Sequence, residues 1–494
     1  MMQKNMSIAT LMLIIITTVY SFSSMATAFF MMGTKSLAWF IISALGYFIP
    51  YALIVAQYSR KYAHQKGTIY DWLKDSLSPK IAFITAFLWY CSYFTWMVSL
   101  FMKLIIPASI LLFGKDITNK MTWLSLPTQV WLALLAIVAV FCLTYFINRG
   151  FHHIISFLKI SSFTMVGLLL LSLFSNLILL FLHPENFVPN LIKSWHAPSF
   201  FAGTDNQFFT QFPFFIFAIT AFGGLDTVAS LADKTNESRK KFPKAVIFSA
   251  GVVTILYIFG IILWSGTNDI TTLRQTNQLH LGNLMYGLTG SLANSLAKGL
   301  EFNPWQSNLL CQFYIRYTAF TLLTAYIGLL SSITYGPLKS LITGTPKEIW
   351  PQPFITLNQK QMPEKALWLQ ASLISICIAA LAFNNALVGN LFNQLTYMTN
   401  VSRALPYLVV AASFPFFIQK NVVTQNMLLV PIKKINYLLS FSVCLCVTAA
   451  IFFQIYSPFQ AGEYNNVLTL IFGPSLFSLL AAKLYQRFED RQVI

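Results

Sequence analysis

Two short segments combine residue types that could bind a small charged molecule. Residues 20–24 read YSFSS, and residues 222–226 read FGGLD. Serine hydroxyls compete for backbone hydrogen bonds and paired glycines weaken a helix, so both segments are expected to interrupt helices. An interruption exposes N–H groups that suit a carboxylate and carbonyls that suit an ammonium group. The segments therefore indicate a site for a zwitterion; the alternative is that they let neighbouring helices pack closely.

Four ionisable residues lie inside long apolar runs: Lys103, Asp226, Arg316 and Arg403. A charge that faces lipid at mid-depth costs about 2.5–3.5 kcal/mol, so each is expected to face a cavity or a partner. Asp226 directly follows the glycine pair, and we favour a proton acceptor or a clamp on that turn over an ion pair. Lys103 and Arg316 could instead extend to the outer surface of the membrane. Arg403 could point into a pore.

Other residues could line a site or bind an ion. Tyr93 and Trp96 belong to an aromatic stripe at helical spacing, which lines a cavity or packs against other helices. Ser331 and Ser332 could bind sodium through their hydroxyls; the alternative is that they only pack between helices. The six cysteines lie in apolar stretches and lack metal-ligand spacing. We therefore expect no catalytic residue, no metal site and no cofactor.

The composition places these segments in a membrane. Of the 494 residues, 56% are hydrophobic and 10% are charged, whereas a soluble globular protein carries roughly 25% charged residues. A soluble enzyme, a fibrous protein and a disordered chain are excluded. The net charge of +17 comes from basic residues in short breaks between apolar runs, which indicates membrane topology and no nucleic-acid partner. An all-α protein embedded in the lipid bilayer is predicted.

A helix needs about 20 apolar residues to cross the hydrocarbon core. By that rule residues 1–494 form a single transmembrane domain, and its longest connection is the Gly- and Leu-rich segment 266–305, expected against the outer mouth. The twelve predicted spans are 6–32, 37–58, 81–113, 127–147, 154–182, 207–232, 244–265, 306–341, 365–384, 387–417, 434–456 and 465–487.

The basic residues also predict the orientation. With the N-terminus inside, lysine and arginine favour the inner connections over the outer ones by roughly four to one, so both termini are predicted to be cytoplasmic. Lys4, the apolar run 6–20 and the sequence Ala26-Thr27-Ala28 also resemble a secretory signal with its cleavage site. We favour a first transmembrane helix, because the apolar run continues and eleven further spans follow.

The two interrupted spans stand at matching places in the chain. They are about 200 positions apart, as expected for two repeats of five helices in which the odd number of spans inverts the second copy. The first repeat would occupy 6–182 and the second 207–417, with two extra helices in 434–487.

Several segments resemble a known transporter family. The run FGGLDTVASLADKTNESRKKFPKAVIFSAG (222–251) resembles the sixth-helix signature of the amino acid–polyamine–organocation superfamily. Segments 67–83, 395–408 and 412–417 are similar to its glutamate/GABA antiporter branch, and within that branch to the YjeM-type inner-membrane transporters. The similarity covers nearly the whole chain, and YGPLKSLITGTPKEIWPQP (335–353) is its most specific part.

The resemblance implies the five-plus-five inverted-repeat fold with broken first and sixth helices, and amino-acid transport across the inner membrane by alternating access. It also implies binding turns in those two helices. Matched position by position, the turns fall on Ser21, Phe22, Ser23 and Ser24, and on Phe222, Gly223, Gly224 and Asp226. One departure is that Thr220 stands where relatives often carry a bulky aromatic gate, so Phe217 or Phe222 would have to close the site.

The expected function is exchange of glutamate- or GABA-like amino acids. Proton- or sodium-coupled symport of another amino acid is the alternative. A membrane-embedded enzyme is a remote one, because no histidine lies in the middle of a span. Three basic candidates against one acid predict a net-positive vestibule that suits a second carboxylate on the substrate. Neither the coupling ion nor the oligomeric state is indicated.

Overall fold

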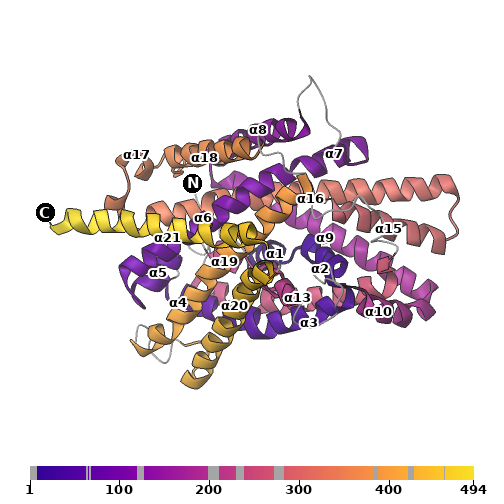
Figure 1. Cartoon of the computed structure of the whole chain (residues 1–494), viewed down its shortest axis with the longest axis horizontal. Coiled ribbons are helices and arrows are strands. Elements are labelled where there is room, and N and C mark those ends of the chain that lie inside the picture. The colour runs from indigo at the N-terminus through magenta and orange to yellow at the C-terminus, as the bar shows by residue number, and fades with distance from the viewer. Residues whose placement is uncertain are drawn as a thin grey trace.

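The computed structural model describes residues 8–62, 65, 68–118, 127–198, 211–229, 238–271, 283–382, 388–420, 428–460 and 462–493, and every regular element in these ranges is a helix (Figure 1). Helices satisfy their backbone hydrogen bonds internally, as an apolar bilayer requires. The segment Ala26-Thr27-Ala28, which resembled a cleavage site in the alternative interpretation, lies buried inside a helix. Lys4, the glycine of the 67–83 motif and most of the loop after the second expected break lie outside the described residues.

The first half of the chain forms long helices joined by short turns. Ser78 caps the 25-residue helix that begins at Pro79 through its side chain, and Pro79 occupies the first turn, where no N–H is needed. The elements are α1 (Ile8–Val19), α2 (Phe22–Met32), η1 (Gly33–Lys35), α3 (Ser36–Ser43), the π-helix η2 (Ala44–Phe48), α4 (Ile49–Lys61), α5 (Ile69–Lys74), α6 (Pro79–Lys103), α7 (Ile105–Phe113), α8 (Thr128–Asn148) and α9 (Phe151–Leu182).

The second half begins with short helices and ends with the longest ones. Asn303 and Gln306 form a reciprocal capping box at the start of α16. The elements are η3 (Pro184–Asn186), α10 (Phe187–His196), α11 (Pro213–Ala221), α12 (Leu225–Ala229), α13 (Ser238–Thr267), α15 (Leu284–Gly299), α16 (Pro304–Gly344), η6 (Lys347–Ile349), α17 (Gln352–Ile355), α18 (Glu364–Ala382), α19 (Val388–Gln419), α20 (Lys433–Gln460) and α21 (Tyr464–Val493).

Ten helical stretches of the described chain are long and apolar enough to cross a membrane. Each of the twelve expected spans overlaps a helix, but two differences have physical causes. The first two spans run together as 11–61, because only a short turn at Gly33–Lys35 separates them. The expected span 207–232 corresponds to the shorter apolar stretch Pro213–Ala229, which an interruption divides.

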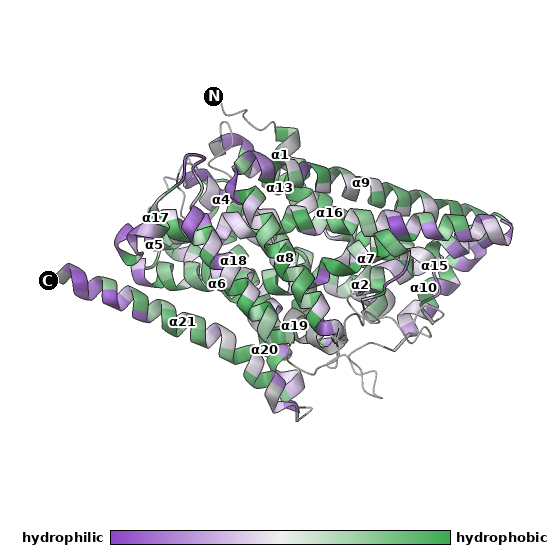
Figure 2. Ribbon diagram, turned by 90° about the horizontal axis from the view of Figure 1, so that it is seen from above, coloured by the Kyte–Doolittle hydropathy of each residue, from purple (hydrophilic) through white to green (hydrophobic). Residues whose placement is uncertain are grey.

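Apolar side chains cover the outer faces of the bundle between two polar ends. Val138 on α8 is 65% exposed and Phe163 on α9 is 81% exposed, as expected for side chains that face lipid. Figure 2 shows hydrophilic residues gathered at two ends of the molecule. One end, called here the α5 end, carries α5, α17 and the last part of α21; the other, the α10 end, carries α10 and α15.

The connection expected at 266–305 contains a helix that was not predicted. Helix α15 buries Leu288, Leu292 and Leu296 and packs against α9 and α16. Its glycines, serines and asparagines are residue types typical of a loop. Its leucines indicate a helix only when the neighbouring helices that cover them are known. Residues 272–282 of the connection lie outside the described part.

Helix α10 ties two other elements together at the α10 end. The Thr34 N–H in η1 donates to Ser194 Oγ at 3.1 Å, and Lys193 Nζ lies 2.6 Å from Asp269 Oδ2 just after α13. Partial burial raises the pKa of Asp269, but the hydrogen bonds from Lys193 and Thr271 outweigh it and hold that pKa below its ordinary value.

Candidate functional site

Both expected interruptions are present. Helix α1 ends at Val19 and α2 begins at Phe22, with Ser21 in an extended conformation and its hydroxyl accepting from the Ser24 N–H at 3.2 Å. Helix α11 ends at Ala221 and α12 begins at Leu225. Gly224 has φ +119°, a conformation that residues with a side chain rarely adopt. Serine and glycine therefore interrupt these helices for the reasons expected from their chemistry.

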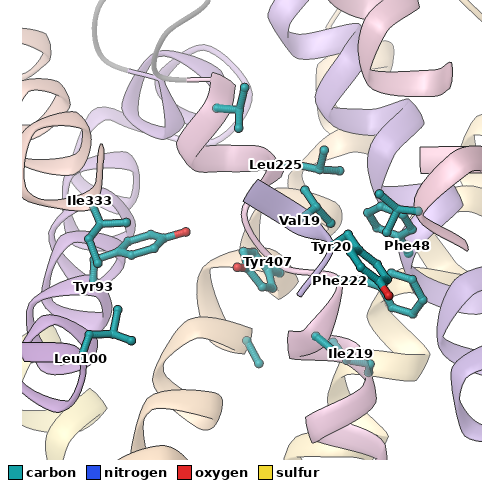
Figure 3. Packing of buried hydrophobic residues seen from close by; sticks show 14 of the residues in the cluster. Val19, Tyr20, Phe48, Tyr93, Leu100, Ile219, Phe222, Leu225, Ile333 and Tyr407 are labelled. Carbon is teal, nitrogen blue, oxygen red and sulfur yellow. The ribbon is translucent and has the colours of Figure 1, made fainter. Parts of the chain in front are cut away.

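The two interruptions lie side by side at the edge of a cavity of about 210 Å³. In Figure 3, Val19 and Tyr20 lie close to Phe222 and Leu225, with Tyr93 across from them on a separate helix. Helices α6, α9, α16, α19 and α20 contribute the remaining walls of the cavity. Segments about 200 residues apart thus share one cavity, which inverted repeats would also require.

The cavity receives helix ends of opposite polarity. Ser21, Ser23 and Ser24 line it at the start of α2, where the N–H groups of Phe22 and Ser23 have no acceptor within the helix. Thr18 lines it at the end of α1 and Ala221 at the end of α11, where carbonyls lack intrahelical donors. The partial positive charge of the first end and the partial negative charge of the other two suit a carboxylate and an ammonium group.

A basic wall stands opposite these helix ends. The Arg403 guanidinium lies 4.1 Å from the ring centroid of Trp96 and 5.6 Å from that of Tyr93, a cation–π arrangement. Arg403 is 6% exposed, and its Nε has no hydrogen-bond partner within the described chain. Arg403, Trp96 and Lys103 all line the cavity, and none of the described lining residues is acidic. The cavity is therefore net positive.

Asp226 lies fully buried just outside this lining. Trp89 Nε1 and the Tyr93 hydroxyl both donate to its Oδ2, the latter at 2.9 Å, while Oδ1 has no partner in the described structure. Because Tyr93 gives its one hydroxyl proton to Asp226, it accepts a hydrogen bond from the Thr227 hydroxyl at 2.6 Å. Among the described residues, Asp226 forms no ion pair with Arg403. Tyr93 therefore connects the acid of α12 to the basic wall on α19.

Several expected site residues do not reach the cavity. The Phe22 ring packs 6.0 Å from Trp264, and the Phe222 ring stacks 4.6 Å from Phe48. Phe222 therefore does not close the site, whereas Phe217 does line it. Gly224 lies against Thr18. Tyr93 contacts the wall through Arg403 and through the ring of Trp96, whose centroid lies 6.0 Å from its own.

Arg316 is also absent from the cavity. It is exposed on α16, and its Nη1 donates to the Leu111 carbonyl at 3.3 Å, near the end of α7. The cause is electrostatic, since carbonyls at a helix C-terminus attract a cation. Arg316 therefore extends away from the cavity, which is the alternative that the sequence left open, because position along an apolar run indicates depth but not direction.

The sequence interpretation missed three polar contributors. Asn400 lines the cavity and accepts from Thr220 at 3.2 Å, and Gln454 of α20 also lines it. Both stand inside predicted spans, so a search for uncharged polar residues could have found them. Tyr257 lies in an apolar stretch of α13 and hydrogen-bonds to both interruptions, and nothing in its local sequence marks it.

Comparison with known proteins identifies the family. The model of the amino acid permease family matches residues 6–477. The chain belongs to the amino acid permease family. The permease is 35% identical over 491 residues to the inner membrane transporter YjeM of Salmonella typhimurium strain LT2, which covers 99% of this chain and 97% of that one. YjeM of Escherichia coli K12 is 34% identical with the same coverage.

A more distant relative is the aspartate/glutamate permease AcaP of Lactococcus lactis subsp. cremoris, at 23% identity over 76% of this chain and 72% of AcaP. The resemblance seen in the sequence is thus confirmed. The permease is a multi-pass transporter of the inner membrane rather than an enzyme, and its cargo is a small-molecule amino acid.

Proposed function

We propose that this permease is a secondary active transporter that exchanges glutamate- or GABA-like amino acids by alternating access. The observation that carries the proposal is the cavity wall. Helix ends of opposite polarity face two basic side chains, Lys103 and Arg403, and no described lining residue is acidic. Such a site suits a zwitterion that bears an additional carboxylate and disfavours one that bears a second ammonium group.

The two interruptions would bind the backbone groups of an α-amino acid such as glutamate; GABA would offer them its ammonium group alone and keep its one carboxylate for the basic wall. The α-carboxylate would accept hydrogen bonds from the first N–H groups of α2, and the α-ammonium would donate to carbonyls at the ends of α1 and α11. Ser23 and Ser24 supply further hydroxyls at the α2 end. This part of the site selects for a zwitterion and not for a side chain.

Arg403 would bind the substrate's additional carboxylate. A buried guanidinium with an unpartnered nitrogen is costly unless an anion reaches it. Stacking on Trp96 at 4.1 Å holds its plane in place, and a fixed planar fork suits two parallel hydrogen bonds to a carboxylate. The distant relative AcaP, an aspartate/glutamate permease, supports the same substrate class.

Helix packing supports twelve spans in two inverted repeats, 6–182 and 207–417, with 434–487 outside them. If equivalent helices are five spans apart, four of the five equivalent pairs pack against each other: α1 against α12, α4 against α13, α6 against α16 and α8 against α18. A pseudo-two-fold axis in the membrane plane would produce this pattern. The basic connections would place the α5 end and both termini in the cytoplasm.

Counterflow in proteoliposomes tests the exchange. Vesicles preloaded with unlabelled glutamate should take up labelled glutamate or GABA faster than empty vesicles, and Arg403→Ala should reduce this uptake at least tenfold, as expected when a buried charge-assisted hydrogen bond is lost. Arg316→Ala is the matched control and should transport normally, because Arg316 lies away from the cavity. Uptake of arginine or lysine without any response to glutamate would overturn the substrate assignment.

Proton-coupled uptake is a second candidate, favoured by one observation. The buried carboxyl of Asp226 keeps one oxygen without a partner in the described structure, so a proton could bind there. An inward proton gradient would then accelerate uptake into empty vesicles, and Asp226→Asn would abolish that acceleration. Uptake that depends on internal substrate and ignores the gradient would favour exchange instead.

A further inference from the structure

One buried tyrosine hydroxyl joins the two interrupted helices. The Ser21 N–H donates to Tyr257 Oη at 3.0 Å, and Tyr257 Oη donates to the Ala221 carbonyl at 2.9 Å. Ser21 is the residue that caps α2, and Ala221 is the last residue of α11. Tyr257 is 0% exposed, in the middle of α13. A single oxygen therefore connects backbone groups of both interruptions.

The ring that carries this hydroxyl is packed by residues of both interruptions. Its centroid lies 4.8 Å from that of Tyr20 and 5.0 Å from that of Phe222, and Phe40 of α3 lies 4.9 Å away. Aromatic contacts at these separations favour one orientation of the ring. The hydroxyl is thus fixed in place by the segments that it joins.

The hydroxyl also has a choice of acceptor. A tyrosine carries one hydroxyl proton, so it donates to one carbonyl at a time. The Ala221 carbonyl is at 2.9 Å, and the Val19 carbonyl, at the end of α1, is at 3.4 Å. If α11 moved away from α1, the Tyr257 hydroxyl could donate to the Val19 carbonyl instead of the Ala221 carbonyl. Its oxygen would still accept the hydrogen bond from the Ser21 N–H.

We propose that Tyr257 is a positioning residue that couples the two interruptions, so that movement of one is transmitted to the other during transport. This goes beyond the proposed substrate, because it depends only on passage of an amino acid between the two helix interruptions. Tyr257 itself would not bind the substrate, since it is absent from the cavity lining.

Hydrogen exchange measured by mass spectrometry on purified Tyr257→Phe tests the coupling without any ligand. The substitution keeps the ring and removes only the hydroxyl. We expect backbone amides in 20–24 and in 220–225 to exchange about tenfold faster, because both interruptions lose a shared partner. Tyr314→Phe is the control: its hydroxyl joins α16 to Ser175 on α9 at 2.5 Å, away from the cavity, and its loss should leave both segments unchanged.

Faster exchange confined to 20–24 would overturn the proposal, because it would mean that the hydroxyl only satisfies the Ser21 N–H. The result does not depend on yield, since the pattern along the chain is measured on whatever monodisperse fraction is recovered.

Transport gives a second, independent measurement. The test uses whichever common amino acid the parent protein transports fastest, so it stands even if glutamate is not the substrate. We expect Tyr257→Phe to reduce the maximal rate about tenfold while the half-saturating concentration changes by less than about threefold. A change in the half-saturating concentration alone would make Tyr257 a binding residue and overturn the positioning role.

Discussion

Arg403 shows how a single side chain could select the cargo of this permease. Its charge is buried, its plane is stacked on Trp96, and its Nε is without a partner in the described part of the chain. An arginine held in this way differs from a lysine at the same place, because a lysine offers a compact charge with no planar fork and stacks poorly.

Arg403→Lys should therefore impair transport although the charge is kept. We expect the half-saturating concentration for glutamate in counterflow to rise about tenfold, since the second parallel hydrogen bond and the stacking are lost. Arg316→Lys should change it by less than about twofold, because Arg316 lies exposed on α16 and bonds only to a carbonyl near the end of α7. Equal effects of the two substitutions would contradict a binding role for Arg403.

Gly223 is the residue that lets Arg403 approach the second interruption. A Cβ at Gly223 would lie 2.5 Å from Arg403 Nη2 and 2.9 Å from the Tyr407 hydroxyl. Gly223→Ala should displace the guanidinium and reduce transport more than tenfold with a normal amount of protein in the membrane. Gly251→Ala on α13 is the control, because a Cβ there meets nothing within 4 Å. Normal transport by Gly223→Ala would show that the position of Arg403 is not critical.

At the scale of the element, the interruption between α11 and α12 depends on backbone conformation. Gly224 has φ +119°, and a Cβ there would lie 3.4 Å from the Thr18 carbonyl oxygen. Gly224→Ala should lower both the melting temperature and the transport rate, because a side chain in this region costs about 1–3 kcal/mol. Thermal unfolding beside the Gly251→Ala control measures the first effect. An unchanged melting temperature would mean that the interruption tolerates an ordinary residue.

The elements also show what could be predicted from the sequence. Serine and glycine act on their own backbone, so residues 20–24 and 222–226 were enough to place both interruptions. Helix α15 and Tyr257 depend on neighbours that are distant in the chain, and no local pattern marks them. Of the three expected basic residues, Lys103 and Arg403 line the cavity and Arg316 does not. The sequence could not separate them, because a helix that is apolar on every face does not show which way a charged side chain points.

At the scale of the whole molecule, the polar ends should differ in their exposure to the cytoplasm. A reporter domain that functions only in the cytoplasm should be active when it is fused to either terminus, because basic residues concentrate in the connections on that side. The same reporter inserted after Lys115, between α7 and α8, should be inactive in the same cells. A terminal reporter that is active outside would contradict the twelve-span arrangement.

Helix α10 has a kinetic consequence for the permease. It holds η1 through Ser194 and the end of α13 through Asp269, so a force that pulls these two elements apart passes through the two bonds in series. Bonds loaded in series fail first at the weaker one, and the exposed Lys193–Asp269 pair is weakened by salt. Opening at the α10 end should accordingly become faster as the ionic strength rises, and single-molecule distance records at low and high salt measure the change.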